Sequence, residues 1–404
     1  MKKFLKWAGI AVVAILLIVG GLVAYVAFSG MPNYEVRKID LKVEATPARI
    51  ENGRKLATKL CMACHLDPVR KRLAGNPMLD MPEVFGKAWS KNITQHPERG
   101  IAKWTDGDIA WLLRTGIHPH TGDYVPPWMP KFPHMADEDL YSIIAWLRSD
   151  DSYLAPDDKQ NMTQEPTLFA KFLTHVAFKP FDYPTKPIPY PDTNNTVALG
   201  KYLATAVYDC YQCHSKAFET NDPLVPEKSE GFFGGGAQMP DAAKHLQNIP
   251  NITSSKSGIG KYSRDEFINM MWTGIRPDGT PLRFPMARMN TLTEHELGSI
   301  YDYLMTVPAI DTKVERAALP KEGNSPGAKL FTANGCSGCH GNDGIGIASL
   351  KLADAKYPED STLIDVIKDQ LKYNPDSFMP KFEGHISDAD LAVLAQHVRG
   401  LCKK

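Results

Sequence analysis

The longest apolar stretch of the chain lies at its beginning. After the basic start Met1–Lys6, the residues from Ala8 to Phe28 run for 21 positions without a charge. A helix needs about 20 apolar residues to cross a bilayer, whereas a cleavable signal has an apolar core of about 7–15. We therefore predict an uncleaved signal-anchor within residues 1–30, with its lysines on the cytoplasmic side. A long cleaved signal, ending at the weak Ala27-x-Ser29 pattern, remains the alternative.

Further along, apolar residues recur at helical spacing at the end of three similar units. Capping boxes begin two of these predicted helices, Thr293-x-x-Glu296 and Ser387-x-x-Asp390, while Ala136 breaks the pattern before the other. The spacing i, i+3, i+4, i+7 predicts one buried face on each helix. The three stripes are Leu140, Ile143, Ile144 and Leu147; Leu297, Ile300, Tyr301 and Leu304; and Leu391, Leu394, Ala395 and Val398.

Each unit also begins with a predicted helix. Thr46-Pro47 and Ser325-Pro326 combine a capping hydroxyl with proline at the first helical position, and Asn194-Asn195 offers caps in the second unit. A glycine then stands eight to ten residues ahead of the unit's first cysteine, at Gly53, Gly200 and Gly327. Glycine costs an exposed helix about 1 kcal/mol relative to alanine, so its recurrence indicates close contact with a crossing helix.

The middle parts of the first two units resemble each other. Asn92-Ile93-Thr94 is followed by Gly100-Ile101, and Asn251-Ile252-Thr253 is followed by Gly258-Ile259. The third unit is shorter. Proline-rich or irregular stretches at 179–192 and 309–324 are the predicted linkers.

A Cys-x-x-Cys-His pentapeptide follows the first helix of every unit. Such a motif attaches a c-type haem: its thiols bond the porphyrin, and its histidine binds the iron. A Cys-x-x-Cys pair is also half of a zinc site or a dithiol redox motif. Zinc halves are typically about 15–20 residues apart, and neither alternative explains the repeated histidine. We predict three covalently bound haem c groups, at Cys61, Cys64 and His65, at Cys210, Cys213 and His214, and at Cys336, Cys339 and His340.

A methionine precedes the last helix of each unit and is the predicted second iron ligand. Met129 and Met379 both begin a Met-Pro-Lys-Phe run, whose proline restricts the methionine to an extended backbone. The second unit offers Met286 and Met289. Met286 lies seven residues before Thr293, as Met129 lies seven before Ala136, so Met286 is preferred. The alternatives for the first iron are three nearby histidines, His118, His120 and His134.

Composition adds little to this picture. Lysine plus arginine equals aspartate plus glutamate at 46 each, so no basic excess points to nucleic acid, and a hydrophobic content of 43% is that of an ordinary globular protein. The seventh cysteine, Cys402, has no partner left for a disulfide. We interpret it as a free thiol on a frayed terminus and assign it no role.

These motifs resemble the triheme membrane cytochrome c subunits that accompany periplasmic alcohol- and gluconate-type dehydrogenases. The likeness covers about residues 46–400 and includes Gly234-Gly235-Gly236. It implies an all-α chain with three class I cytochrome c-like domains. Family members typically have a cleaved signal, from which this chain departs. The expected parts are the transmembrane helix 1–30, domain 1 (31–178), the linker 179–192, domain 2 (193–308), the linker 309–324 and domain 3 (325–404).

The expected function is electron transfer without catalysis by the chain itself. Thioether ligation with histidine raises the reduction potential relative to two histidines. The resemblance implies transfer from a periplasmic dehydrogenase to quinone or another respiratory-chain acceptor. The chain would be held to lipid of the inner membrane by its N-terminal helix, with its bulk in the periplasm. The alternatives are a multihaem peroxidase-like enzyme, which needs an open iron site, and an oxidase-associated cytochrome subunit.

Overall fold

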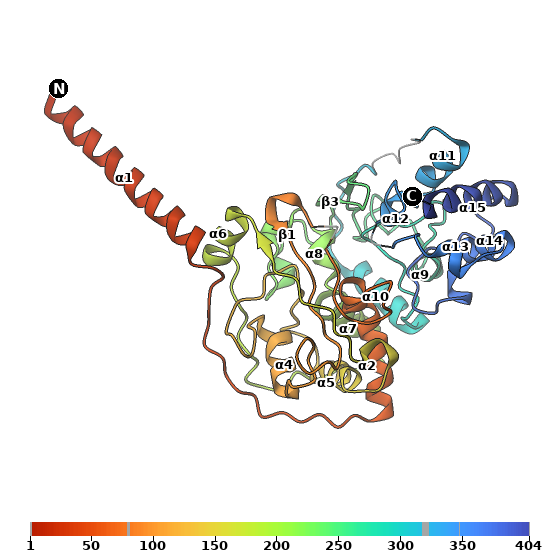
Figure 1. Ribbon diagram of the computed structural model, residues 1–404, viewed down its shortest axis with the longest axis horizontal. Coiled ribbons are helices and arrows are strands. Elements are labelled where there is room, and N and C mark those ends of the chain that lie inside the picture. Colours follow the sequence, from red (N-terminus) through yellow and green to blue (C-terminus); the bar gives the residue numbers. More distant parts are fainter. Residues whose placement is uncertain (1, 79–80, 317–322, 347, 404) are drawn as a thin grey trace.

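The computed structural model describes residues 2–78, 81–316, 323–346 and 348–403, and a single long helix projects from its folded part (Figure 1). This helix, α1 (Lys2–Phe28), is the predicted apolar segment. An 18-residue window within Lys3–Phe28 has a mean hydropathy of 2.8, so the length and composition of this helix suffice to cross a membrane. The same properties are found in N-terminal signal sequences, so they do not decide between anchor and signal.

Three pairs of crossing helices form the rest of the scaffold. Helix α2 (Pro47–Leu60) crosses α5 (Asp137–Leu147), and α11 (Pro326–Ala333) crosses α15 (Asp388–Cys402). Between them, α7 (Thr196–Tyr202) continues into the π-helical turn η3 (Leu203–Val207) and crosses α10 (Glu294–Thr306). The predicted pairing of a first and a last helix in each unit is therefore present.

The predicted caps are confirmed with one exception. The side chains of Thr46, Asn195 and Ser325 accept backbone hydrogen bonds at the starts of the first helices. Thr293 forms a complete capping box, and Ala136 caps α5 without a side-chain bond. At Ser387 only half of the box forms: the hydroxyl accepts from the Asp390 amide, but the Asp390 carboxylate takes its bond from the Ser387 hydroxyl and not from the Ser387 amide.

The recurring glycines lie where the paired helices touch. A Cβ on Gly53 would stand 1.9 Å from the Ser142 carbonyl oxygen, and one on Gly200 would stand 1.8 Å from that of Ser299. On Gly327 it would stand 2.6 Å from the Cβ of His397. The prediction of close helix contact is confirmed at all three positions.

Short elements fill the loops between the paired helices. The chain is rich in helix as predicted, and two short antiparallel strand pairs also form: β1 (Gly86–Lys87) with β2 (Glu165–Pro166), and β3 (Gln238–Pro240) with β4 (Leu246–Asn248). Their backbone groups need partners once the loops are folded over a core. The remaining elements are α3 (Met62–His65), η1 (Glu83–Phe85), β1 (Gly86–Lys87), α4 (Asp106–Thr115), η2 (Ser152–Leu154), β2 (Glu165–Pro166), α6 (Leu168–Val176), α8 (Cys210–His214), η4 (Phe218–Thr220), η5 (Pro226–Lys228), β3 (Gln238–Pro240), β4 (Leu246–Asn248), α9 (Arg264–Thr273), α12 (Ser337–His340), α13 (Ala353–Lys356), α14 (Asp360–Lys368) and η6 (Gln370–Lys372).

The buried side chains form two clusters. The first two units share one continuous cluster, which includes Trp146 of α5 and Leu199 of α7. The second cluster is built mainly on α14 and α15 of the third unit and also includes Ile275 of the second unit. The stretch 179–192 is described throughout and contains neither helix nor strand, as expected of a linker. In the linker 309–324, residues 317–322 lie outside the described part of the chain.

Candidate functional site

All three Cys-x-x-Cys-His motifs lie on single helical turns, α3, α8 and α12, which directly follow the first helix of each unit. In each motif the histidine Nδ1 lies within hydrogen-bonding distance of a backbone carbonyl. The distances are 2.6 Å from His65 to Lys91 O, 2.8 Å from His214 to Pro250 O and 2.5 Å from His340 to Ala348 O. A carbonyl can only accept, so Nδ1 carries the proton and Nε2 keeps its lone pair for a metal.

The carbonyl partners explain the Asn-Ile-Thr likeness between the first two units. Lys91 and Pro250 each stand immediately before that tripeptide. The Asn92 side-chain oxygen accepts from the Thr94 amide at 3.0 Å and its hydroxyl at 2.6 Å. Asn251 does the same with Thr253, at 2.8 Å for both bonds. The tripeptide is therefore a rigid turn that aims the preceding carbonyl at the histidine.

A glycine amide fixes the main chain of each histidine from the other side. Gly75, Gly235 and Gly346 donate to the carbonyls of His65, His214 and His340, at 2.9, 2.8 and 2.7 Å. Gly75 and Gly235 have φ of +87° and +70°, and a Cβ on either would lie within about 2.5 Å of backbone atoms. These glycines and the three carbonyls were not predicted as site residues, although the repeated Asn-Ile-Thr marked two of the carbonyls.

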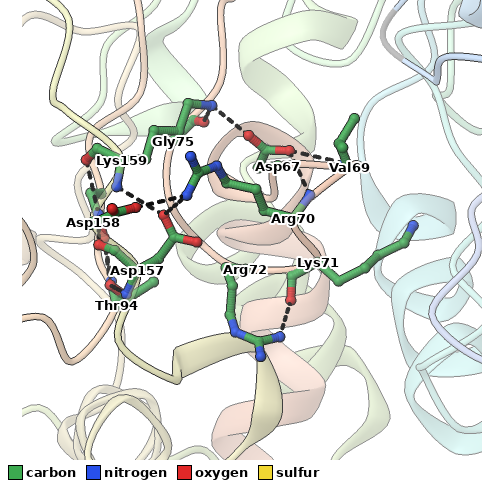
Figure 2. A network of polar contacts seen from close by, with 11 residues as sticks. Asp67, Val69, Arg70, Lys71, Arg72, Gly75, Thr94, Asp157, Asp158 and Lys159 are labelled. Carbon is green, nitrogen blue, oxygen red and sulfur yellow. Dashed lines mark hydrogen bonds and ion pairs between the residues drawn. The ribbon is translucent and has the colours of Figure 1, made fainter.

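A polar network braces the loop after the first motif (Figure 2). The Asp67 carboxylate pairs with Lys159 at 2.6 Å, and the same ammonium donates to the Gly75 carbonyl at 2.5 Å. Arg70 pairs with Asp157 at 2.7 Å. The Asp157 amide donates in turn to the Thr94 hydroxyl at 3.3 Å. The network thus ties together Gly75 and the Asn-Ile-Thr turn, the two segments that hold His65.

The first unit contains a cavity of about 660 Å³ that brings its predicted site residues together. Cys61, Cys64 and His65 lie on its wall, as does Met129. Apolar side chains including Ile93, Leu113 and Phe132 form much of the rest. Such a space fits a flat apolar cofactor held by two thiols and two axial ligands. Of the alternative ligands, His118 lies on this wall, whereas His120 and His134 are not part of it.

Electrostatics agree with haem attachment better than with the alternatives. Burial lowers the pKa of His65, His214 and His340, which keeps each imidazole neutral and able to bind a metal. Burial raises the pKa of the Cys61, Cys210 and Cys336 thiols to about 12, opposite to the lowered values of redox-active thiols. Among the described residues, no three His, Cys, Asp or Glu side chains gather as a zinc site would require.

The methionine loops of the first two units have equivalent backbone conformations. Met129 and Met286 each donate to the carbonyl three residues earlier, at 3.2 and 2.8 Å. Three residues after them, the amides of Phe132 and Met289 donate to Leu113 and Met271 at 2.8 and 2.7 Å, which occupy matching places in α4 and α9. Met286 is thus the structural counterpart of Met129. Met289 corresponds to Phe132 and is buried in the core, with 8% of its surface exposed.

The third methionine loop lies between the other two units. Met379 packs against the cluster of its own unit. Its neighbour Phe378 receives the Lys59 ammonium of α2 over its ring at 4.0 Å, and the Lys381 amide donates to Thr273 O at 2.7 Å. Nearby, Asp376 accepts from both terminal nitrogens of Arg54, at 3.1 and 2.9 Å. The loop that holds this predicted ligand is therefore fixed by contacts from both neighbouring units.

One buried cation at this junction has spare donors. The side chain of Arg288 is 1% exposed, and its Nε makes no hydrogen bond within the described part of the chain. The nearest carboxylate, Asp369 of the third unit, is 3.7 Å from Nη2. A buried guanidinium stabilises anions, so these donors suit the carboxylates that a haem carries.

The β3–β4 hairpin of the second unit touches two haem motifs. Its Met239 sulfur lies 4.0 Å from the Cys213 sulfur, and its Ala242 amide donates to Gly338 O of the third motif at 2.9 Å. Cys402 needs a different description from the one expected. It closes the last turn of α15 and donates through its thiol to Leu350 O at 3.0 Å, so it does not lie on a frayed terminus.

Comparison with known proteins finds similarity to proteins that carry c-type haem. Residues 48–147 and 323–398 match the family model for subunit III of cbb3-type cytochrome c oxidase. The cytochrome c subunit of a quinone alcohol dehydrogenase from Gluconobacter oxydans is 28% identical over 392 residues, 88% of this chain and 79% of that protein. Its counterpart from Gluconacetobacter polyoxogenes is 27% identical over 72% of this chain, which spans only 64% of that relative.

A third relative extends the similarity to another substrate class. The cytochrome subunit of fructose dehydrogenase from Gluconobacter japonicus is 28% identical over 78% of this chain and 68% of its own length. The resemblance to cytochrome c subunits of dehydrogenases is therefore confirmed. This type of protein carries covalently bound haem c and transfers electrons.

Proposed function

We propose, from the similarity to cytochrome c subunits of dehydrogenases, that this chain is a membrane-tethered triheme cytochrome. It carries electrons in the periplasm from a substrate dehydrogenase to an acceptor of the respiratory chain. The observation that supports this most is the repeated proximal geometry. Three Cys-x-x-Cys-His turns each present a histidine whose Nδ1 faces a backbone carbonyl.

Each unit uses the same three kinds of residue: two cysteines that bind the haem, a histidine on one side of the iron and a methionine on the other. The cysteine pairs at 61 and 64, 210 and 213, and 336 and 339 hold the cofactor, with His65, His214 and His340 on one side and Met129, Met286 and Met379 on the other. The haem iron supplies the redox chemistry, while the protein sets position and potential and excludes water. Methionine on the second side closes each iron, which disfavours the peroxidase-like alternative.

Contacts between the units support a relay. The hairpin residue Met239 lies 4.0 Å from Cys213, and three residues later the Ala242 amide bonds the third motif at Gly338. On the other side, Lys59, two residues before Cys61, donates to the Arg288 carbonyl in the loop that follows Met286. Both connections are short paths between neighbouring haem sites.

Native mass spectrometry and haem analysis test this proposal. The expected result is three haems per chain, still attached after denaturation, with residues 1–30 retained. A ratio of two haems per chain would mean that one of the three motifs holds no haem. A mature N-terminus near Gly30 would mean that residues 1–30 are a cleaved signal and not an anchor. Isolation of the native complex in mild detergent should yield a dehydrogenase as neighbour.

A second candidate is supported by the matched family model, whose description is an oxidase subunit. The match covers the first and third units and leaves the second out. In that case the same isolation would yield a terminal oxidase without a dehydrogenase. Rapid turnover of hydrogen peroxide by the purified chain would instead favour the peroxidase-like alternative.

A further inference from the structure

Helix α6 (Leu168–Val176) exposes its large apolar residues and buries small or polar ones, which is the reverse of a helix at the surface of a soluble domain. Its buried positions are Ala170 and Thr174, which are 1% and 0% exposed. Its outward face carries Leu168, Phe169, Phe172 and Val176, which are 46%, 47%, 47% and 54% exposed. At 100° per residue these four side chains fall within one arc of about 100°. A helix that turns phenylalanines outward and threonine inward is built to contact something apolar.

The position of α6 identifies what it contacts. It packs against the C-terminal end of α1, at the point where that helix enters the folded part of the chain (Figure 1). Lys171 donates to Ala27 O at 3.0 Å, and the His175 ring lies 5.6 Å from that of Tyr25. His175 Nε2 also lies 3.1 Å from Gly30 O. The apolar face of α6 is therefore continuous with the end of the predicted membrane span.

We propose that α6 lies in the surface of the lipid bilayer and inserts its Leu168, Phe169, Phe172 and Val176 face among the acyl chains. This rests on the proposed retention of α1 as an anchor, which fixes where the bilayer surface must be. Lys179, which is exposed three residues after the end of α6, suits the phosphate groups of anionic lipids. The anchor and α6 thus form two attachments, a crossing helix and an in-plane helix.

Attachment through both α1 and α6 fixes the orientation of the first unit relative to the membrane. Attachment through α1 alone would let the unit rotate. Phe169 of α6 lies 6.1 Å from Phe85, and Phe85 lies 6.4 Å from Trp128, measured between ring centroids. Trp128 directly precedes Met129. A membrane-bound α6 therefore holds the methionine loop of the first unit next to the bilayer surface.

The test uses the full-length holoprotein in nanodiscs of phosphatidylethanolamine and phosphatidylglycerol. Phe172→Cys is compared with Leu224→Cys, each combined with Cys402→Ser. Leu224 is a matched control because it is 54% exposed but lies in the second unit. A membrane-impermeant maleimide should modify Phe172→Cys at least about tenfold more slowly than Leu224→Cys, because lipid covers the first site. Equal rates would overturn the proposal.

A photoreactive phospholipid in the same nanodiscs identifies what covers the helix. Lipid adducts on the α6 peptide, found by mass spectrometry, would support the proposal. Protection without lipid adducts would overturn it in favour of a second copy of the chain. The intact mass of the protein shows separately whether residues 1–30 are retained. If they are missing, the proposal of an N-terminal anchor is wrong. Lipid adducts on α6 in vesicles of the same lipids then still support the α6 proposal, and their absence overturns it.

Discussion

The first two units differ from the third in how they support their haem motifs. In the first two, an Asn-Ile-Thr turn places the carbonyl that holds the histidine, and both units share one hydrophobic cluster. The third unit has a separate cluster and holds His340 through Ala348, only eight residues away. Its motif and its methionine loop also bond to the second unit, through the Ala242 amide and the Thr273 carbonyl. A small haem domain can thus supplement short internal loops with contacts to its neighbours.

The largest expected effect compares the glycines at the helix crossings. Gly53→Ala and Gly200→Ala should each destabilise the protein by about 3 kcal/mol, because the new methyl meets a backbone carbonyl that cannot move aside. Gly327→Ala should cost less, about 2 kcal/mol, since its nearest atom is the His397 Cβ at 2.6 Å and the nearest backbone oxygen, Val393 O, is 3.0 Å away. Urea unfolding of the holoprotein measures all three.

Gly400→Ala is the control, because a Cβ there has no heavy atom within 4 Å. It should leave stability unchanged or raise it slightly, since alanine favours a helix. Equal losses at Gly327 and Gly53 would show that the third crossing is as tight as the first.

The next prediction concerns the second methionine loop. Met286→Ala should remove a sulfur ligand, lower that haem's reduction potential by roughly 0.1 V or more, and allow carbon monoxide to bind. Met289→Leu should leave both properties almost unchanged, because leucine conserves most of the volume. Spectroelectrochemistry of each variant checks this.

The opposite pattern, with loss of the ligand in Met289→Leu alone, would mean that the loops of the first two units do not correspond. No change in either variant would place the sixth ligand outside this loop.

Removing a contact between units should affect the third unit more than the others. Asp376→Asn weakens the bidentate pair with Arg54, and its side chain is only 8% exposed, so a loss of about 2 kcal/mol in docking is expected. Hydrogen exchange should rise in residues 325–403 first. Asp158→Asn is the control: that side chain is 85% exposed in its pair with Arg70, and exchange should not change.

A uniform rise in exchange after Asp376→Asn would contradict this assignment. It would mean that the third unit and the other two unfold as one cooperative body.

The smallest expected effect is a pH dependence at the same junction. Burial and the neighbouring Arg288 guanidinium lower the pKa of Lys59 to about 7, against an ordinary value of 10.5. Between these values the unfolded chain holds more protons than the folded one, so stability rises with pH from about 7 to 10.5. Relative to Lys59→Met, the wild type should gain about 1 kcal/mol in free energy of unfolding between pH 7 and 8. A stability difference that stays constant over this range would mean that Lys59 remains charged.

The sequence predicted the parts of the fold that depend on local chemistry. Helix caps, apolar stripes and the recurring glycines each act within one helix or one crossing, and Thr46, Ser325 and Gly200 behave as expected. The choice of Met286 over Met289 is supported because spacing to a helix start is also local. Its role as a ligand, like those of Met129 and Met379, remains a prediction.

What the sequence did not reveal depends on contacts over long separations. The carbonyls of Lys91, Pro250 and Ala348 carry no side-chain signal, so their role appears only when the loops are folded. The shared cluster of the first two units and the β3–β4 contact with Gly338 are likewise products of packing. Cys402 was misjudged because α15 extends through it.

The docking of the third unit has a consequence for how such proteins change over evolution. Two of its contacts join main chain to main chain: the Ala242 amide with Gly338 O, and the Lys381 amide with Thr273 O. Every residue except proline has the same amide and carbonyl. Mutations that alter side chains at these positions therefore leave the contact available. An interface of this kind can persist while its sequence drifts, and it would be hard to recognise from covariation between the residues that meet there.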